Sequence, residues 1–159
     1  MDNQNKHYLY PGTLFVSRTP FNVTTVLGSC ISVTLTDPVS GVGGINHFMI
    51  PLWNGEGLAT PKFGNVAIKK LINEMILNGA ERKRLQAKIF GGSSLYKNGS
   101  STLDIGRKNI KIAEKMLDEE GIPVTNCDTG GSRGRKVLFF TDTGIVRIRM
   151  LNMLKIKDK

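Results

Sequence analysis

Short runs of β-branched and aromatic residues, separated by turn-forming residues, determine which architectures this sequence can adopt. In residues 31–36 apolar side chains alternate with serine and threonine, which is the two-residue period of a half-buried strand. A turn sequence, Asp-Pro-Val-Ser-Gly, follows at residues 37–41, and residues 42–50 are again strand-like. The sequence therefore predicts a β-hairpin in which residues 31–36 pair with residues 42–50.

Further strands and two helices complete the predicted fold. Strand-like runs occupy residues 13–17, 22–27, 85–90 and 122–127, and a C-terminal hairpin spans 137–149. Helical spacing predicts one helix after Thr60-Pro61 that ends at Asn78-Gly79. It predicts a second over about residues 104–120, between an Asp104 cap and Gly121. Each helix is apolar on one face, so we expect an α+β fold, a strand-rich core of mixed and antiparallel sheets with two amphipathic helices packed on one side.

The length of 159 residues suits one domain. We place this domain at residues 11–153, between a flexible N-terminal tail (1–10) and a basic C-terminal tail (154–159). No apolar run approaches the roughly 18 residues of a membrane span, and the polar N-terminus does not resemble a signal peptide. We therefore expect a cytoplasmic protein. The net charge of +9 favours an acidic partner without choosing among nucleic acid, a membrane surface and a protein.

Cys30 and His47 have the clearest potential for chemistry. Cys30 follows Gly28-Ser29 at the turn into the first hairpin strand, and His47 lies in the second strand, so the two can meet across the ladder. A free cysteine is only about 3% thiolate at pH 7, whereas a pKa of about 6 beside an imidazolium would make it about 90% thiolate. The same imidazolium can protonate a leaving amine. Cys127 has no comparable partner, and we interpret it as structural.

A histidine in this role usually donates its other ring nitrogen to an acceptor. Thr24 and Thr25, on the strand before Cys30, can each supply a hydroxyl or backbone oxygen. The residues themselves leave the choice between them open. The other histidine, His7, falls in the predicted tail and is a poor candidate.

Five blocks, present together and in this order, resemble the chemoreceptor glutamine deamidase family, CheD. They are VTTVLGSC (23–30), GINHFMIP (44–51), AKIFGGS (87–93), IGRKN (105–109) and DTGGSRGR (128–135). The resemblance implies a Cys-His-Thr catalytic group, in which Cys30 is the nucleophile, His47 the base and Thr24 the threonine six residues before the cysteine, with Thr25 as its open alternative. It implies conversion of selected glutamines to glutamate on the cytoplasmic helices of methyl-accepting chemotaxis receptors. No metal or organic cofactor is expected.

Other residues of these blocks are candidates for oxyanion or substrate contacts. They are Gly28, Ser29, Asn46, Gly91, Gly92, Ser93, Asp128 and Thr129. Backbone N–H groups near Ser29 and Cys30 are expected to hold the oxyanion. The segment 91–94 lacks the spacing of a nucleophile elbow, and the segment 128–131 lacks the lysine of a phosphate-binding loop. We interpret both as loops that line or shape the substrate cleft.

Three other functions stay open at this point. A module that binds and regulates a CheC-type phosphatase without catalysis would have the same fold, and the resemblance includes such a partner. A thiol esterase acting on glutamate methyl esters would form the same acyl-enzyme. Only the positive charge favours a nucleic-acid-binding domain. The sequence lacks the aromatic platforms interleaved with basic residues that such domains use. We therefore expect neither nucleic-acid binding nor membrane insertion.

Overall fold

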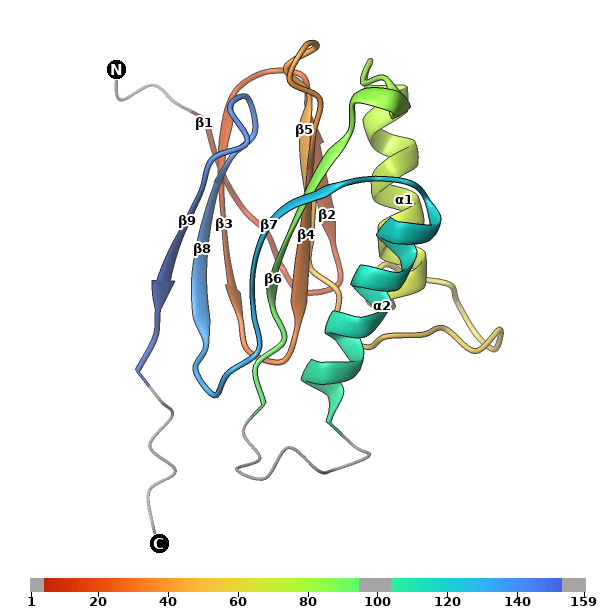
Figure 1. Ribbon diagram of the computed structural model, residues 1–159, viewed down its shortest axis with the longest axis vertical. Coiled ribbons are helices and arrows are strands. Elements are labelled where there is room, and N and C mark those ends of the chain that lie inside the picture. Colours follow the sequence, from red (N-terminus) through yellow and green to blue (C-terminus); the bar gives the residue numbers. More distant parts are fainter. Residues whose placement is uncertain (1–4, 95–103, 153–159) are drawn as a thin grey trace, which may run out of the picture.

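The computed structural model describes residues 5–94 and 104–152, which form two sheets and a helical layer (Figure 1). The elements are β1 (Asn5–Tyr8), β2 (Leu14–Ser17), β3 (Phe21–Leu27), β4 (Ile31–Thr36), β5 (Gly43–Asn46), α1 (Gly64–Leu77), the 3₁₀ turn η1 (Arg82–Arg84), β6 (Gln86–Gly91), α2 (Ile105–Glu119), β7 (Val124–Thr129), β8 (Arg135–Phe140) and β9 (Val146–Met150). Strands β1-β3-β8-β9 form one sheet, here called the outer sheet. Strands β2-β5-β4-β6-β7 form the other, the central sheet.

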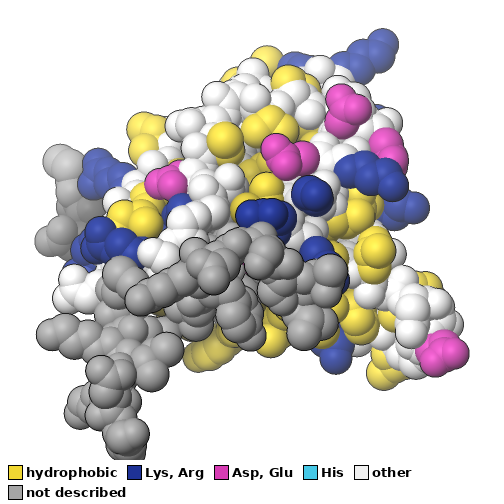
Figure 2. All heavy atoms as spheres, turned by 60° about the horizontal axis from the view of Figure 1, so that its bottom comes forward, with side chains coloured by type: hydrophobic (Ala, Val, Ile, Leu, Met, Phe, Trp, Pro, Cys, Tyr) yellow, Lys and Arg dark blue, Asp and Glu magenta, His cyan; other side chains and the backbone are white. Residues whose placement is uncertain are grey.

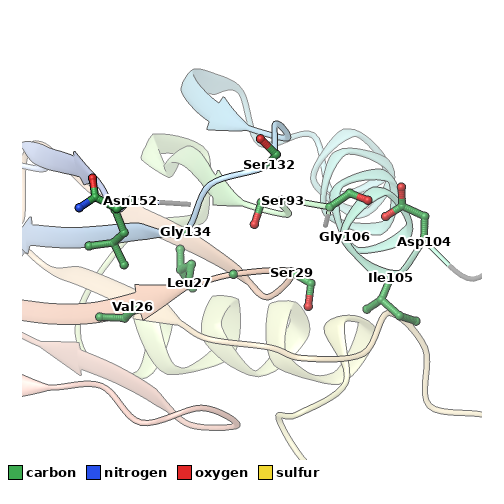
Figure 3. Close-up of a pocket in the computed structure, with 13 residues that line it drawn as sticks. Val26, Leu27, Ser29, Ser93, Asp104, Ile105, Gly106, Ser132, Gly134 and Asn152 are labelled. Carbon is green, nitrogen blue, oxygen red and sulfur yellow. The ribbon is translucent and has the colours of Figure 1, made fainter. Parts of the chain in front are cut away.

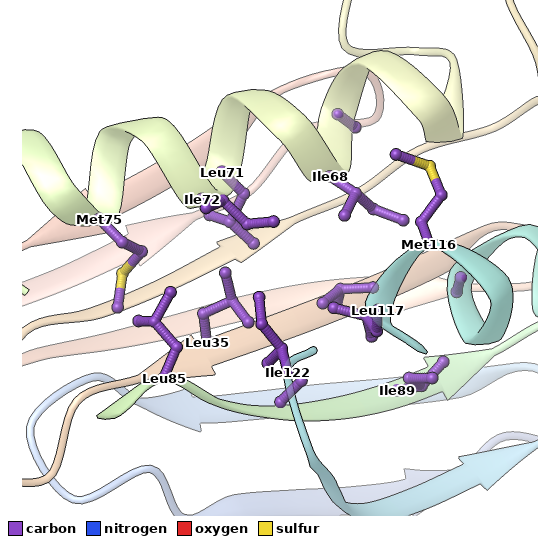
Figure 4. Packing of buried hydrophobic residues seen from close by; sticks show 14 of the residues in the cluster. Leu35, Ile68, Leu71, Ile72, Met75, Leu85, Ile89, Met116, Leu117 and Ile122 are labelled. Atoms are coloured by element: carbon purple, nitrogen blue, oxygen red, sulfur yellow. The ribbon is translucent and has the colours of Figure 1, made fainter. Parts of the chain in front are cut away.

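The predicted α+β fold is confirmed. Both sheets are mixed, because β1 runs parallel to β3 and β6 runs parallel to β7, whereas the other pairs are antiparallel. Helices α1 and α2 pack together on the face of the central sheet that points away from the outer sheet. Figure 4 shows their apolar side chains meeting those of β4 and β6.

The predicted hairpin pairing is confirmed, but β5 ends at Asn46, short of the predicted end at residue 50, and the first strand is not half-buried. β4 pairs with β5, and the Ile31–Phe48 bridge extends the pairing. Ile31 and its apolar neighbours face the helices, while Ser32 and Thr34 are buried too, because the outer sheet covers the opposite face. Alternation therefore separates two buried faces rather than a core face from solvent.

A buried carboxylate fixes the turn of this hairpin. Asp37 accepts hydrogen bonds from Arg84 Nε (2.8 Å) and Arg84 Nη2 (2.9 Å) and from the backbone N–H of Glu81 (2.9 Å). These bonds hold the pKa of the Asp37 carboxyl well below its usual range. The turn is thereby tied to the segment between α1 and β6.

The helix boundaries follow the sequence signals at three of four ends. α2 is capped by Asp104, which accepts from Arg107 N (3.1 Å), and Gly121 follows it with a φ of +69°. α1 is followed by Asn78 and by Gly79 with a φ of +101°. The predicted cap at Thr60-Pro61 is wrong. α1 begins at Gly64, because the Thr60 carbonyl accepts from Phe63 N (3.2 Å) and forms a turn before the helix.

The predicted flexible tail at residues 1–10 is wrong for residues 5–10. β1 pairs in parallel with β3, and Leu9 is fully buried between the sheets. The pairing uses backbone groups, so its polar sequence gives no periodic signal, and the folded region begins before residue 11. The predicted basic tail, 154–159, lies outside the described residues. No described helix is long and apolar enough to cross a bilayer.

Candidate functional site

The connection between β3 and β4 brings Cys30 to one end of the sandwich. Residues 28–30 leave the outer sheet and enter the central sheet at Ile31. Cys30 packs at the margin of the apolar cluster between the two sheets, and its side chain is only partly buried. The thiol therefore belongs to the inter-sheet layer without being sealed inside it.

Strand register places His47 on the same face as Cys30. The Ile31–Phe48 bridge keeps the register of the β4–β5 ladder, so Ser32 lies opposite His47. Cys30 is two residues from Ser32 and thus shares its face. Cys30 and His47 are diagonal neighbours, for which Cα atoms lie roughly 7–8 Å apart.

The hydrogen-bond partner of His47 is Thr25. Thr25 Oγ1 lies 2.7 Å from His47 Nδ1, and both side chains are buried. Thr24, favoured by the family resemblance, immediately precedes Thr25 in β3, and its side chain points to the opposite face of the outer sheet. The assignment of Thr24 is therefore corrected to Thr25. The sequence held the signal, because Thr25 shares its strand face with the apolar residues Val23 and Leu27.

The bonds of Thr25 also fix the tautomer of His47. A carbonyl can only accept, so the Thr25 hydroxyl donates its single proton to Leu9 O (2.8 Å). Thr25 Oγ1 must then accept from His47 Nδ1, which carries the proton of the neutral ring. Nε2 is left with the lone pair of a base. It is buried and has no hydrogen-bond partner among the described residues.

Burial disfavours the charged forms of both groups. It raises the pKa of the Cys30 thiol, an effect that the Cys30 backbone N–H partly offsets. It lowers the pKa of His47 to about 4. At neutral pH the free site thus holds a neutral thiol and a neutral imidazole. The lowered Cys30 pKa beside an imidazolium, expected from the sequence, is not found, because desolvation acts on both groups.

The end of β6 holds the backbone around Cys30. Gly92 N donates to Cys30 O (2.9 Å), and Ser93 N donates to Gly28 O (3.0 Å). Gly91 has a φ of +105°, and a Cβ there would lie 2.2 Å from Cys30 O, so only glycine permits this approach. The structure therefore brings this predicted loop to the Cys30 segment.

Asn109 is a site residue that the sequence interpretation missed. It is fully buried on α2, and its Nδ2 donates to Ser29 O (3.0 Å) and Met49 O (3.1 Å). One side chain thus ties the segment entering Cys30 to the segment leaving His47. The available signal was a carboxamide on the inward face of an amphipathic helix, one turn before Ala113.

Three predicted substrate contacts lie elsewhere. Asn46 is buried, and its Oδ1 accepts from Val33 N (2.8 Å), where it replaces a backbone acceptor of the ladder. Asp128 accepts from Arg135 Nη2 (3.1 Å), which orders the turn after β7. Thr129 lines a separate depression between β7 and α2. None of these three lines the pocket beside Cys30.

A pocket of about 580 Å³ opens beside the Cys30 loop (Figure 3). Gly28 and Ser29 line it, together with Ser93, which follows β6, and Ile105, the first residue of α2. Figure 2 looks toward this end of the molecule, where lysine and arginine side chains are interspersed with apolar ones. A side chain that enters this pocket would lie against residues 28–29 of the loop that carries Cys30.

No three His, Cys, Asp or Glu side chains gather as a metal site within the ranges that the structure describes. Cys127 is exposed on β7, at the edge of the central sheet. Cys30 and His47 are the candidate reactive groups at this end, where the carboxylate of Asp104 also lines the pocket.

Comparison with known proteins identifies a family. The family model described as CheD chemotactic sensory transduction matches residues 49–150. A protein of Trichlorobacter lovleyi named "Probable chemoreceptor glutamine deamidase CheD" is 47% identical over 141 residues, 89% of this chain and 88% of that protein. A relative of the same name from Sulfurimonas denitrificans is 43% identical over 145 residues, 91% of this chain and 93% of the relative.

Proposed function

The chain belongs to the CheD family, and from this premise we propose that it converts glutamine side chains of chemoreceptors to glutamate, with Cys30 as nucleophile and His47 as base. The observation that carries the proposal is the Leu9–Thr25–His47 chain of hydrogen bonds. It leaves the basic lone pair of His47 on Nε2, on the sheet face that Cys30 shares. A nucleophile needs a base oriented in this way.

The neutral resting state favours attack with simultaneous proton transfer. Cys30 Sγ attacks the side-chain carbonyl carbon of glutamine as its proton passes to His47 Nε2. The carbonyl electron pair moves to oxygen, which the backbone N–H of Cys30 can stabilise. His47 returns the proton to nitrogen, the C–N bond breaks, and ammonia leaves a thioester.

Water completes the cycle. It loses a proton to His47 Nε2 and attacks the thioester carbonyl carbon, after which the C–S bond breaks and the sulfur regains its proton. The product is a glutamate side chain. A base–nucleophile contact is often long in a free enzyme and tightens when substrate binds, which suits the diagonal arrangement of Cys30 and His47.

Mass spectrometry of a chemoreceptor cytoplasmic fragment tests the proposal. We expect the mass gain of glutamine-to-glutamate conversion with the wild-type chain and with Cys127→Ala, which removes the exposed cysteine outside the site. We expect none with Cys30→Ala. An equal gain with Cys30→Ala would refute the nucleophile assignment.

Two finer predictions extend this proposal. Glutamate methyl esters would form the same thioester with methanol as the leaving group, which methanol release can detect. Binding to a CheC-type phosphatase would be a separate role. A Cys30→Ala chain that changes phosphatase activity but releases no ammonia would demonstrate that separation.

A further inference from the structure

The exposed face of the outer sheet is basic. Its strands β1, β3, β8 and β9 contain no aspartate or glutamate. Their solvent-facing positions include four exposed cations, Lys6, Lys136, Arg147 and Arg149. Helices α1 and α2 do not cover this face, because both pack on the far side of the central sheet (Figure 1).

Three of these cations, those on β8 and β9, lie on adjacent strands, and Lys6 lies on the opposite edge strand of the sheet. Lys136 pairs directly with Arg149 across the β8–β9 ladder, and Arg147 lies in the next outward row, 5.2 Å from the Phe140 ring. Within the described part of the chain, none of the four cations forms an ion pair. Like charges directly opposite in a sheet are destabilising. A partner that supplies carboxylates would offset this repulsion.

The basic face is continuous with the pocket beside Cys30. Val26 pairs with Lys136, is exposed, and lines the pocket together with Ser29. Gly134 and Leu151, which flank β8 and β9, line the same pocket. A macromolecule bound over Lys136 therefore borders the opening through which a side chain would reach the nucleophile loop.

We propose that this face docks a carboxylate-rich protein surface next to the target glutamine, with Lys136 and Arg149 as its principal contacts. The inference rests on the proposed function and adds to it the chemistry by which the substrate is recognised. Val26, Leu138 and Phe140 lie among the cations on the same face. Apolar groups between charged ones suit an amphipathic protein surface, whereas a phosphate backbone offers them nothing to contact.

The test compares two double variants with the same change in net charge. Lys136→Glu with Arg149→Glu reverses the charge of the two principal contacts on the outer sheet. Lys69→Glu with Lys70→Glu reverses the charge of two exposed positions on α1, in the helical layer. Ammonia release is measured with a chemoreceptor cytoplasmic fragment and with a short uncharged glutamine peptide. Binding of the fragment is measured separately in a Cys30→Ala background, where no reaction follows.

For the outer-sheet variant, we expect the ratio of kcat/KM for the fragment to kcat/KM for the peptide to fall about tenfold. Fragment binding should weaken by a similar factor, and added salt should reduce the difference. The α1 variant should change neither quantity. Equal losses in both variants, no loss in either, or an equal loss with both substrates would overturn the docking surface.

The outcomes separate this inference from the proposed function. A wild-type chain that releases no ammonia from either substrate contradicts deamidation, and the binding measurement still decides the docking surface. Random duplex DNA that requires Lys136 and Arg149 for binding, while the fragment does not, would assign the face to nucleic acid and overturn the protein partner.

Discussion

Lowering the pH from about 7 to about 5 is expected to destabilise the fold through His47. The ring is buried, and its pKa is about 4 in the folded chain, against 6.5 without burial. Between these values the unfolded chain binds a proton that the folded chain does not. The free energy of unfolding therefore rises with pH across this window and decreases as the pH falls.

The size of the loss follows from the two pKa values. The full difference, 6.5 − 4, corresponds to about 3 kcal/mol at 1.36 kcal/mol for each unit. At about pH 5 an unfolded histidine is almost fully protonated while folded His47 is still mostly neutral, so about 2 kcal/mol is lost relative to pH 7. With an ordinary urea dependence, the unfolding midpoint shifts by about 1 M.

Urea unfolding at several pH values between about 5 and 7 measures this term. We expect His47→Gln, which has no proton to gain, to lose about 2 kcal/mol less than wild type across the range. His7→Gln removes the other histidine, keeps His47 and should retain the wild-type dependence. Identical pH dependence in wild type and His47→Gln would refute the argument that burial holds the His47 ring neutral.

Three further predictions concern single side chains. Thr25→Val should lower kcat about 100-fold, because the His47 ring is then no longer held in the tautomer that carries the proton on Nδ1. Thr24→Val should change kcat less than about twofold in the same ammonia assay. Equal effects of the two variants would contradict the assignment of Thr25. Asn109→Ala removes the donor of two part-buried hydrogen bonds, to Ser29 O and Met49 O, and should lower the free energy of unfolding by about 1–3 kcal/mol, measured in urea. An unchanged urea midpoint would contradict a stabilising role for these two bonds. Asp37→Asn weakens the bonds to Arg84 and should lower the free energy of unfolding by about 2 kcal/mol at pH 7. This difference from wild type should shrink as the pH falls, because the wild-type carboxylate is then protonated. A difference that does not depend on pH would contradict a role for the ionised carboxylate.

Local signals in the sequence were sufficient for most elements. Alternation and turn residues predicted the hairpin of residues 31–50, and a capping aspartate with a terminal glycine bounded α2. These signals act over a few residues, so they do not depend on the rest of the fold. The hairpin also placed Cys30 and His47 on neighbouring strands, since register between adjacent strands is a local property.

Contacts between distant segments needed the tertiary structure. The two-residue period and the apolar residues Val23 and Leu27 place Thr25 on the inner face of its strand, but only the stacking of the two sheets brings that face against His47. β1 pairs through backbone groups that carry no sequence pattern, and Leu9 O then fixes the imidazole tautomer. The pKa shifts of Cys30 and His47 likewise follow from burial, which the complete packing determines. The sequence by itself determined the residue types and the local pairing of this site, whereas its orientation and protonation depend on surfaces contributed by other strands.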